Sequence, residues 1–128
     1  MVIEVDDKRT FVPEWNGNRD LADGQIKIAH RFLKPGERKK YMYSKPLKIN
    51  AEGKIDGVEY VQDERGVCEA LILSIEGLEL KTGDKTVKVT TGAELYNTPG
   101  VPQALVAEIE MYMIGATPEV DRDFLSGR

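Results

Sequence analysis

Two side chains in this sequence carry the chemistry that enzymes commonly use for proton transfer or nucleophilic attack, the single histidine His30 and the single cysteine Cys68. A histidine acts as a general base only where a nucleophile or an orienting carboxylate lies within reach, and a cysteine attacks as the thiolate. His30 falls on the apolar side of an alternating segment, and Cys68 falls on an apolar helical stripe. We therefore predict that Cys68 belongs to the core, that His30 is a core or edge residue rather than a base, and that the chain is not an enzyme.

The sequence lacks the common motifs for phosphate, nucleotide or metal binding. It contains no G-x-x-x-x-G-K-[ST], no G-x-G-x-x-G, no H-E-x-x-H and no cysteine pair. Two acidic groups, Asp6 with Asp7 and Glu119 with Asp121 and Asp123, offer carboxylates to a divalent cation. Neither group has the spacing of a calcium-binding loop. We interpret both as solvated acids and predict no metal and no cofactor.

The basic residues are concentrated in one segment. The chain has a net charge of -4, but residues 31–48 hold seven positive side chains against one negative, Glu37, a local charge of +6 that leaves -10 for the rest. The positive ones are Arg31, Lys34, Arg38, Lys39, Lys40, Lys45 and Lys48. Such a segment is able to bind nucleic acid with Tyr41 and Tyr43, to dock an acidic protein surface, or simply to stay solvated. The acidic remainder favours the solvated interpretation first, protein docking second and nucleic acid last.

Aromatic and apolar side chains outside the regular pattern are candidates for partner binding. Trp15, between Pro13 and an Asn-Gly turn, is interpreted first as a loop plug over the core and second as an exposed hot spot. Phe124 and Leu125 are the apolar pair of a polar tail. The candidate partner-binding residues are Trp15, Arg38, Lys39, Lys40, Tyr41, Phe124 and Leu125.

Length and composition indicate one domain. The chain has 128 residues, 41% of them hydrophobic and 31% charged, which is the composition of a globular protein. We expect a single domain over residues 1–116 and a polar tail over residues 117–128. No apolar run is long enough to cross a bilayer, the first residues do not have the pattern of a signal peptide, and one cysteine cannot form an internal disulfide. A cytosolic compartment is the expectation.

The first half of the chain predicts short strands around one small helix. Ile26, Ile28, His30 and Phe32 share one side of an alternating segment over residues 25–32, which predicts a half-buried strand. The other expectations are a first strand over residues 2–5, an extended segment over 11–18 ending in an Asn-Gly turn, a helix of one or two turns over 34–41, and a hairpin of strands over 43–49 and 58–61.

The second half predicts the two main helices. Val67, Leu71, Ile75 and Leu78 recur at helical spacing, so a helix capped by Asp63 is expected over residues 63–76. A small β-turn unit over 78–89 and a short helix with a capping box at Thr91–Glu94 follow. A second main helix is expected over 99–114, capped by Thr98 and stopped by Gly115. Together these elements predict an α+β fold in which two main helices pack on a small, mostly antiparallel sheet.

Several segments give this chain a resemblance to a known protein family. Residues 11–21 (Phe-Val-Pro-Glu-Trp-Asn-Gly-Asn-Arg-Asp-Leu), the strand over 25–28 and the basic segment over 35–41 resemble the opening of small siphophage tail-assembly chaperone-like proteins. Residues 73–78, 91–95 and 105–109 are similar to the second half of that family. The resemblance covers roughly residues 11–124.

The resemblance implies a non-enzymatic phage protein. Members of the family shield the apolar helix of the tape-measure protein before the tail tube polymerises, so the implied partner is a phage tape-measure or tail-tube protein, with self-association as a further expectation. The implied location is the host cytoplasm during tail assembly, or the virion. The alternatives are a virion structural component of the tail or head-tail region, and a module that binds nucleic acid or a host protein through residues 31–48.

Overall fold

Strand β3 (Lys27–Arg31) is the centre of the main sheet in this computed structural model, which describes residues 1–47, 50–54 and 57–120. Strands β2 (Lys8–Phe11) and β6 (Ile72–Glu76) pair with it, one on each side and both antiparallel. Ile28 and His30 of β3 are fully buried while Lys27 is exposed. The alternating pattern predicted for residues 25–32 is therefore confirmed, because side chains of a half-buried strand alternate between core and solvent.

Three helices cover the buried side of this sheet and complete the core. They are α2 (Glu64–Leu71), α3 (Gly92–Asn97) and α4 (Gln103–Gly115). Helix α4 contributes Leu105, Ile109 and Met113, and these pack in one cluster with Ile28 of β3 and Leu71 of α2. The predicted α+β class, with helices on a small antiparallel sheet, is confirmed.

The predicted helix over residues 63–76 is wrong in its second half, because the chain leaves helix α2 at Leu71 and continues as strand β6. The helical spacing of the apolar residues has another cause. The pairing register moves from Ala29 opposite Ser74 to His30 opposite Ile72, so Leu73 is an extra residue in β6. Such a bulge lets Ile72 and Ile75, three residues apart, both face the core from a strand.

The predicted start of the second main helix is also wrong. Helix α4 begins at Gln103 with Pro102 as the preceding residue, instead of beginning at Pro99 behind a Thr98 cap. Residues 98–102 contain two prolines, and a proline disfavours helical backbone at the residue before it. Pro102 therefore delays the helix past Val101. At the other end Gly115 is the last helical residue and Ala116 is the C-cap, one residue later than predicted.

Two predicted helix caps are present. The Asp63 carboxylate accepts a hydrogen bond from the backbone N–H of Gly66 at 2.9 Å, and the Thr91 hydroxyl accepts one from the N–H of Glu94 at 3.1 Å. The Glu94 carboxylate reaches back to the N–H of Thr90 at 3.1 Å, one residue before the expected Thr91. Each cap satisfies a backbone donor that the first turn of a helix leaves open.

The segment after β2 forms the helical turns η1 (Trp15–Asp20), with Asn16 at a φ of 51°, so the predicted Asn-Gly turn is confirmed. The buried side chain of Asn18 holds this segment on the body. Its amide nitrogen donates to the carbonyls of Pro13 at 2.8 Å and Ile26 at 3.1 Å, and its amide oxygen accepts from the N–H of Ile26 at 2.7 Å. These bonds fix the path of the chain into β3.

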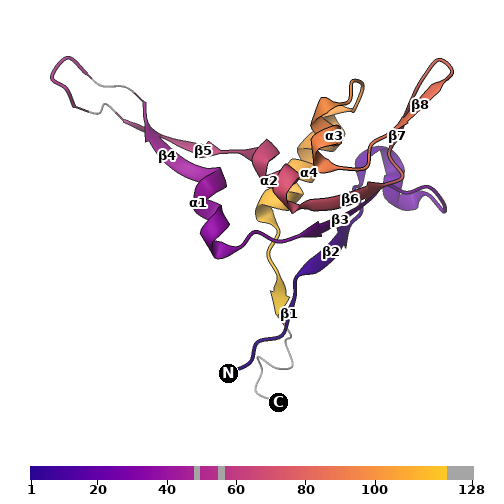
Figure 1. The fold of residues 1–128 in the computed structure, drawn as a ribbon, viewed down its shortest axis with the longest axis horizontal. Coiled ribbons are helices and arrows are strands. Elements are labelled where there is room, and N and C mark those ends of the chain that lie inside the picture. Colours follow the sequence, from indigo (N-terminus) through magenta and orange to yellow (C-terminus); the bar gives the residue numbers. More distant parts are fainter. Residues whose placement is uncertain (48–49, 55–56, 121–128) are drawn as a thin grey trace.

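Two hairpins leave the body in different directions (Figure 1). The first follows η2 (Pro35–Glu37) and α1 (Arg38–Tyr41) and consists of β4 (Met42–Pro46) and β5 (Val58–Gln62). The second consists of β7 (Glu79–Thr82) and β8 (Lys85–Lys88). Both hairpins were predicted. An isolated two-stranded hairpin is marginally stable in water, so each gains from further contacts.

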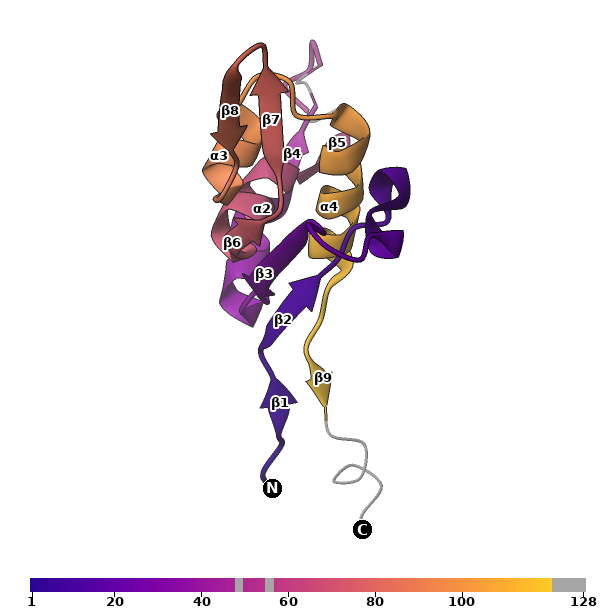
Figure 2. The ribbon, with the colours of Figure 1, turned by 90° about the vertical axis from the view of Figure 1, so that its right-hand side faces the viewer.

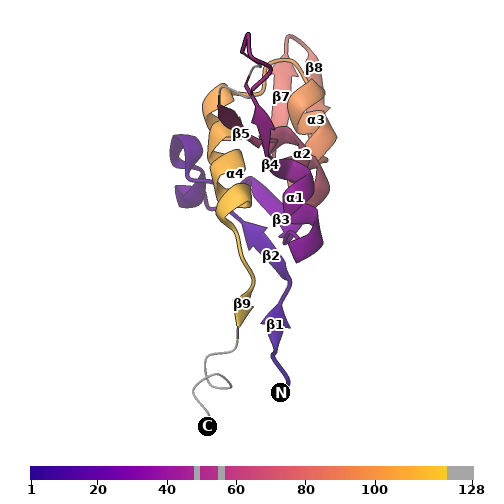
Figure 3. The ribbon, with the colours of Figure 1, turned by 90° about the vertical axis from the view of Figure 1, so that its left-hand side faces the viewer.

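The two ends of the described chain run side by side below the body. Strand β1 (Val5–Asp6) pairs antiparallel with β9 (Glu119–Val120), and Figures 2 and 3 show both leaving the sheet in the same direction. The predicted first strand over 2–5 thus begins later, at Val5. The segment expected as a polar tail, residues 117–128, contains strand β9, and its residues 121–128 lie outside the described residues. Within the described residues, no helix is long and apolar enough to cross a membrane.

Candidate protein-binding surfaces

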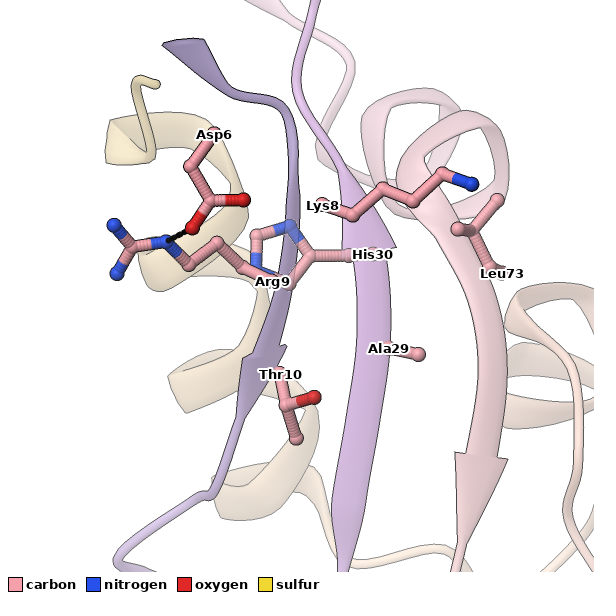
Figure 4. A pocket seen from close by; sticks show the side chains of 7 residues that line it. All are labelled: Asp6, Lys8, Arg9, Thr10, Ala29, His30 and Leu73. Atoms are coloured by element: carbon pink, nitrogen blue, oxygen red, sulfur yellow. Dashed lines mark ion pairs between the residues drawn. The ribbon is translucent and has the colours of Figure 1, made fainter. Parts of the chain in front are cut away.

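The outer side of the main sheet carries a shallow hollow of about 520 Å³. Figure 4 shows its residues, which come from the start of the chain and from all three strands. The lining residues are Asp6, Lys8, Arg9, Thr10, Ala29, His30 and Leu73. The centre is small or apolar, because Thr10 lies opposite Ala29 in the ladder and Leu73 is the bulged residue of β6.

The rim of this hollow is charged. Lys8 extends toward Leu73 in Figure 4. Arg9 pairs with Asp6 at 3.2 Å and lies opposite His30 in the ladder, so this ion pair is on the other side of β2 from Thr10. Leu73 is 52% exposed, an unusual position for a leucine on an otherwise ordered strand. An apolar floor with a charged rim is the general composition of a protein-binding surface.

His30 does not provide a base to this hollow, because its ring is fully buried and both ring nitrogens are occupied. Nδ1 lies 3.0 Å from the carbonyl oxygen of Arg31, which only accepts, so Nδ1 carries the proton. Nε2 then accepts from the hydroxyl of Tyr112 at 3.0 Å. Burial lowers the pKa of His30, and the charge of Arg9 adds to that effect. His30 is thus a neutral core residue, as the sequence predicts.

Lowering the pH from about 7.5 to about 5 is expected to reduce the free energy of unfolding. The folded-state pKa of His30 lies below the ordinary 6.5, so the unfolded chain takes up a proton first as the pH falls. The contribution of neutral His30 to the free energy of unfolding is fully present above pH 6.5, and it is lost as the pH drops toward the folded-state pKa. Urea unfolding at several pH values measures it.

The control for this prediction is the variant His30→Asn, which has no titrating ring. Its unfolding free energy is expected to be lower than that of the parent but flat across the same range. Glu37, whose pKa falls from 4.5 to about 2 because Arg31 binds it, loses its contribution only at lower pH. An equal pH dependence in the parent and the variant would contradict the role of His30.

Cys68 is not a nucleophile either. It is fully buried, and burial raises the pKa of its thiol to about 11. It interacts with the hydroxyl of Tyr96, which in turn donates to the Glu110 carboxylate at 2.8 Å. Burial and both of these neighbours raise the pKa of Tyr96. This chain of groups ties α2, α3 and α4 together, and the core position predicted for Cys68 is confirmed.

Ion pairing and burial leave fewer side chains of the basic segment available for binding. Arg31 forms a two-pronged ion pair with Glu37, at 2.8 and 3.0 Å, which cancels one of the seven positive charges. Tyr41 is buried in the core cluster, with the Lys40 ammonium 5.4 Å from the centre of its ring. Its placement among the candidate surface residues is therefore corrected, because a ring in the core cannot stack on a base. Arg38, Lys39 and Lys40 are exposed, as expected.

Trp15 is half-buried against the core, which agrees with the loop-plug interpretation. Glu108 of α4 holds this loop: its carboxylate accepts hydrogen bonds from the backbone N–H of Glu14 at 2.6 Å and of Trp15 at 2.9 Å. The remaining candidates, Phe124 and Leu125, lie outside the described residues.

Several strongly exposed apolar side chains carry no mark in the sequence as a candidate site. On the hairpin β4–β5, Tyr60 is 84% and Leu47 is 58% exposed, and Val58 and Tyr43 are also open to solvent. Val58 and Tyr60 do alternate with polar residues, which is the signal of a strand with one apolar side. That signal does not say whether another element covers the apolar side.

Metal binding finds no support among the described residues, where no group of three or more histidine, cysteine, aspartate or glutamate side chains is placed to hold an ion. Asp6, one of the candidate carboxylates, is paired with Arg9. Asp121 and Asp123 lie outside the described residues.

Comparison of the chain with protein-family models, with curated proteins and with solved structures found no match.

Proposed function

We propose that this chain is a non-enzymatic assembly protein of a siphophage-type tail, which binds a tape-measure or tail-tube protein in the host cytoplasm. The observation that carries the proposal is the distribution of apolar side chains. Leu73 and Tyr60 are exposed on strands, and Leu47 is exposed directly after strand β4. His30 and Cys68 are buried, and both interact with tyrosine hydroxyls. Surfaces of this kind favour binding of another protein. The segments that resemble tail-assembly chaperones add the class of partner.

The hollow on the main sheet is the surface we assign to this partner. An apolar helix or strand of the partner would place its side chains against Leu73, Ala29 and Thr10. Lys8, two residues before Thr10 and therefore on the same side of β2, would fix its orientation by charge. A contact of this size favours transient binding, which suits a chaperone that must later release the tape measure.

Coexpression with the tape-measure and tail-tube proteins of the same genome tests the proposal. The parent chain is expected to keep one of them soluble and to co-purify with it. Leu73→Asp, which places an unpaired charge on the apolar floor, is expected to reduce the co-purified amount at least about tenfold. Met111→Asp, on an exposed part of α4, is the matched control and should have no effect. If the parent chain captures neither protein, the proposal is wrong.

A nucleic-acid-binding function is favoured by one observation, the three adjacent exposed cations Arg38, Lys39 and Lys40 on α1. Burial of Tyr41 and the Arg31–Glu37 pair weigh against it. Micromolar binding to a generic duplex that falls steeply with salt and disappears in Lys39→Glu/Lys40→Glu would favour this function over protein binding.

A further inference from the structure

Two exposed apolar segments of opposite charge project from different sides of the body. The first, the basic arm, consists of α1 and the hairpin β4–β5, within residues 38–62. The second, the terminal segment, consists of residues 1–7 and includes β1. Figure 1 shows them leaving the body in different directions, so one copy presents both to its surroundings.

The basic arm is apolar at its surface and positively charged. Over residues 38–62 the sequence has six positive and three negative side chains, a net charge of +3. Val58 and Tyr60 lie on one side of the hairpin, opposite Pro46 and Ser44 in the register, and both are exposed. Among the described residues this sheet has two strands, so β4 and β5 each have one edge without a described neighbouring strand.

The terminal segment has the complementary composition. Residues 1–7 contain three acids, Glu4, Asp6 and Asp7, and no positive side chain, a side-chain charge of -3. Before these acids stand two strongly exposed apolar residues, Val2 at 71% and Ile3 at 52%. Within the described residues, strand β1 pairs with β9 over Val5 and Asp6, and residues 1–4 precede this pairing.

We propose that copies of this chain bind one another head to tail, with the terminal segment of one copy lying along the β4–β5 hairpin of the next. Addition of a strand to an open sheet edge forms main-chain hydrogen bonds. Side chains alternate along such a strand, so it brings either Val2 or Ile3 to the side of the hairpin that carries Val58 and Tyr60. Asp6 and Lys45 already have partners in Arg9 and Glu59. Glu4 and Asp7 therefore face Arg38, Lys39 and Lys40 of the neighbouring copy.

Charge decides between this arrangement and a symmetric dimer. Pairing two basic arms would bring +3 against +3, and pairing two terminal segments would bring -3 against -3. Only the unlike pairing is attractive. An interface between two different surfaces of the same chain is heterologous, so it continues into a ring or an open filament. A ring or filament of small subunits is also a geometry that could surround or extend a tube. This inference does not depend on which foreign protein binds the hollow.

The experiment measures the mass of the purified full chain by light scattering during size-exclusion chromatography, at about 100 μM, above the micromolar Kd expected for a small interface. The parent chain is expected to form species larger than a dimer, which decrease in mass as NaCl is raised. The arm variant Val58→Ser/Tyr60→Ser and the terminal variant Val2→Ser/Ile3→Ser are each expected to be monomeric. Val87→Ser, at another exposed apolar position on β8, should assemble like the parent.

Mixing the two monomeric variants distinguishes head-to-tail from symmetric binding. The arm variant keeps an intact terminal segment and the terminal variant keeps an intact arm, so an equimolar mixture is expected to form a 1:1 dimer and nothing larger. A mixture that stays monomeric, a terminal variant that still associates, or a parent chain that is monomeric overturns the proposal. A monomeric parent chain would indicate that the basic arm binds a different protein.

Reciprocal charge reversal gives a second, independent measurement that leaves the apolar residues in place. Lys39→Glu/Lys40→Glu and Glu4→Lys/Asp7→Lys are each expected to weaken association at least about tenfold in Kd, and combining all four changes in one chain should restore most of it. Far-UV circular dichroism confirms that each variant is folded. Failure of the combined variant to recover would contradict the pairing of these charges.

Discussion

Replacement of Ile109 by alanine is expected to lower the free energy of unfolding by about 2–5 kcal/mol. Ile109 is fully buried at the centre of α4, in the cluster where this helix meets α2 and the main sheet. Removing its side chain leaves a cavity lined by residues that belong to separate elements, such as Leu71 and Ile28. These elements cannot all move in to fill the cavity. The loss of unfolding free energy therefore includes the transfer free energy of the removed atoms and the cost of the remaining cavity. Urea unfolding followed by circular dichroism measures it.

Met111→Ala is the matched control, because it changes the same helix two residues further along at a strongly exposed position. Alanine raises helix propensity at both sites by a few tenths of a kcal/mol, so the comparison removes that contribution. The control variant is expected to stay within about 0.5 kcal/mol of the parent. An Ile109→Ala variant as stable as Met111→Ala would mean that α4 does not pack on the sheet as described.

Strand β3 and hairpin β7–β8 show how far local sequence determines this fold. Ile28 and His30 alternate with Lys27 and Ala29 because one side of β3 faces helices and the other faces solvent. The segment Thr82-Gly83-Asp84-Lys85 supplies residues that tolerate the backbone of a tight turn. In both cases the information lies within a few residues, so the sequence alone predicts the element.

Strand β6 shows where local sequence is insufficient. Ile72 and Ile75 are spaced as on a helix, and only the pairing with β3, more than forty residues earlier in the chain, makes Leu73 a bulge. Along the sequence, a helix and a bulged strand give the same spacing of apolar residues. The choice between them depends on the open edge of β3, a long-range contact that the segment itself does not encode.

The surfaces were even less accessible to prediction than the fold. The hollow brings together Thr10, Ala29 and Leu73 from three strands, and none of these side chains carries chemistry that marks a site. The charge of the basic segment was visible, but its pairing of Arg31 with Glu37 and the burial of Tyr41 were not. Counting charges gives the sign of a surface, whereas contacts decide which charges remain available.

The β7–β8 hairpin depends on a close approach between two backbone segments. The sequence alone does not predict this approach. Gly77, between β6 and β7, has a φ of +78°, and a Cβ atom there would lie 2.2 Å from the carbonyl oxygen of Gln25. The next residue, Leu78, is buried and accepts a backbone hydrogen bond from Val89 at 3.0 Å. A side chain at residue 77 would therefore push the base of the hairpin away from the sheet.

Gly77→Ala is accordingly expected to lower the free energy of unfolding by about 2–5 kcal/mol, from about 1–2 kcal/mol for a left-handed backbone and about 1–3 kcal/mol for the overlap. Gly83→Ala separates these contributions. Gly83 also has a positive φ, +62°, but a Cβ atom there meets nothing within 4 Å. Gly83→Ala is expected to lower the free energy of unfolding by only about 1–2 kcal/mol. If urea unfolding gives equal losses for the two variants, the contact between Gly77 and Gln25 is not as close as described, and the hairpin is held by its turn alone.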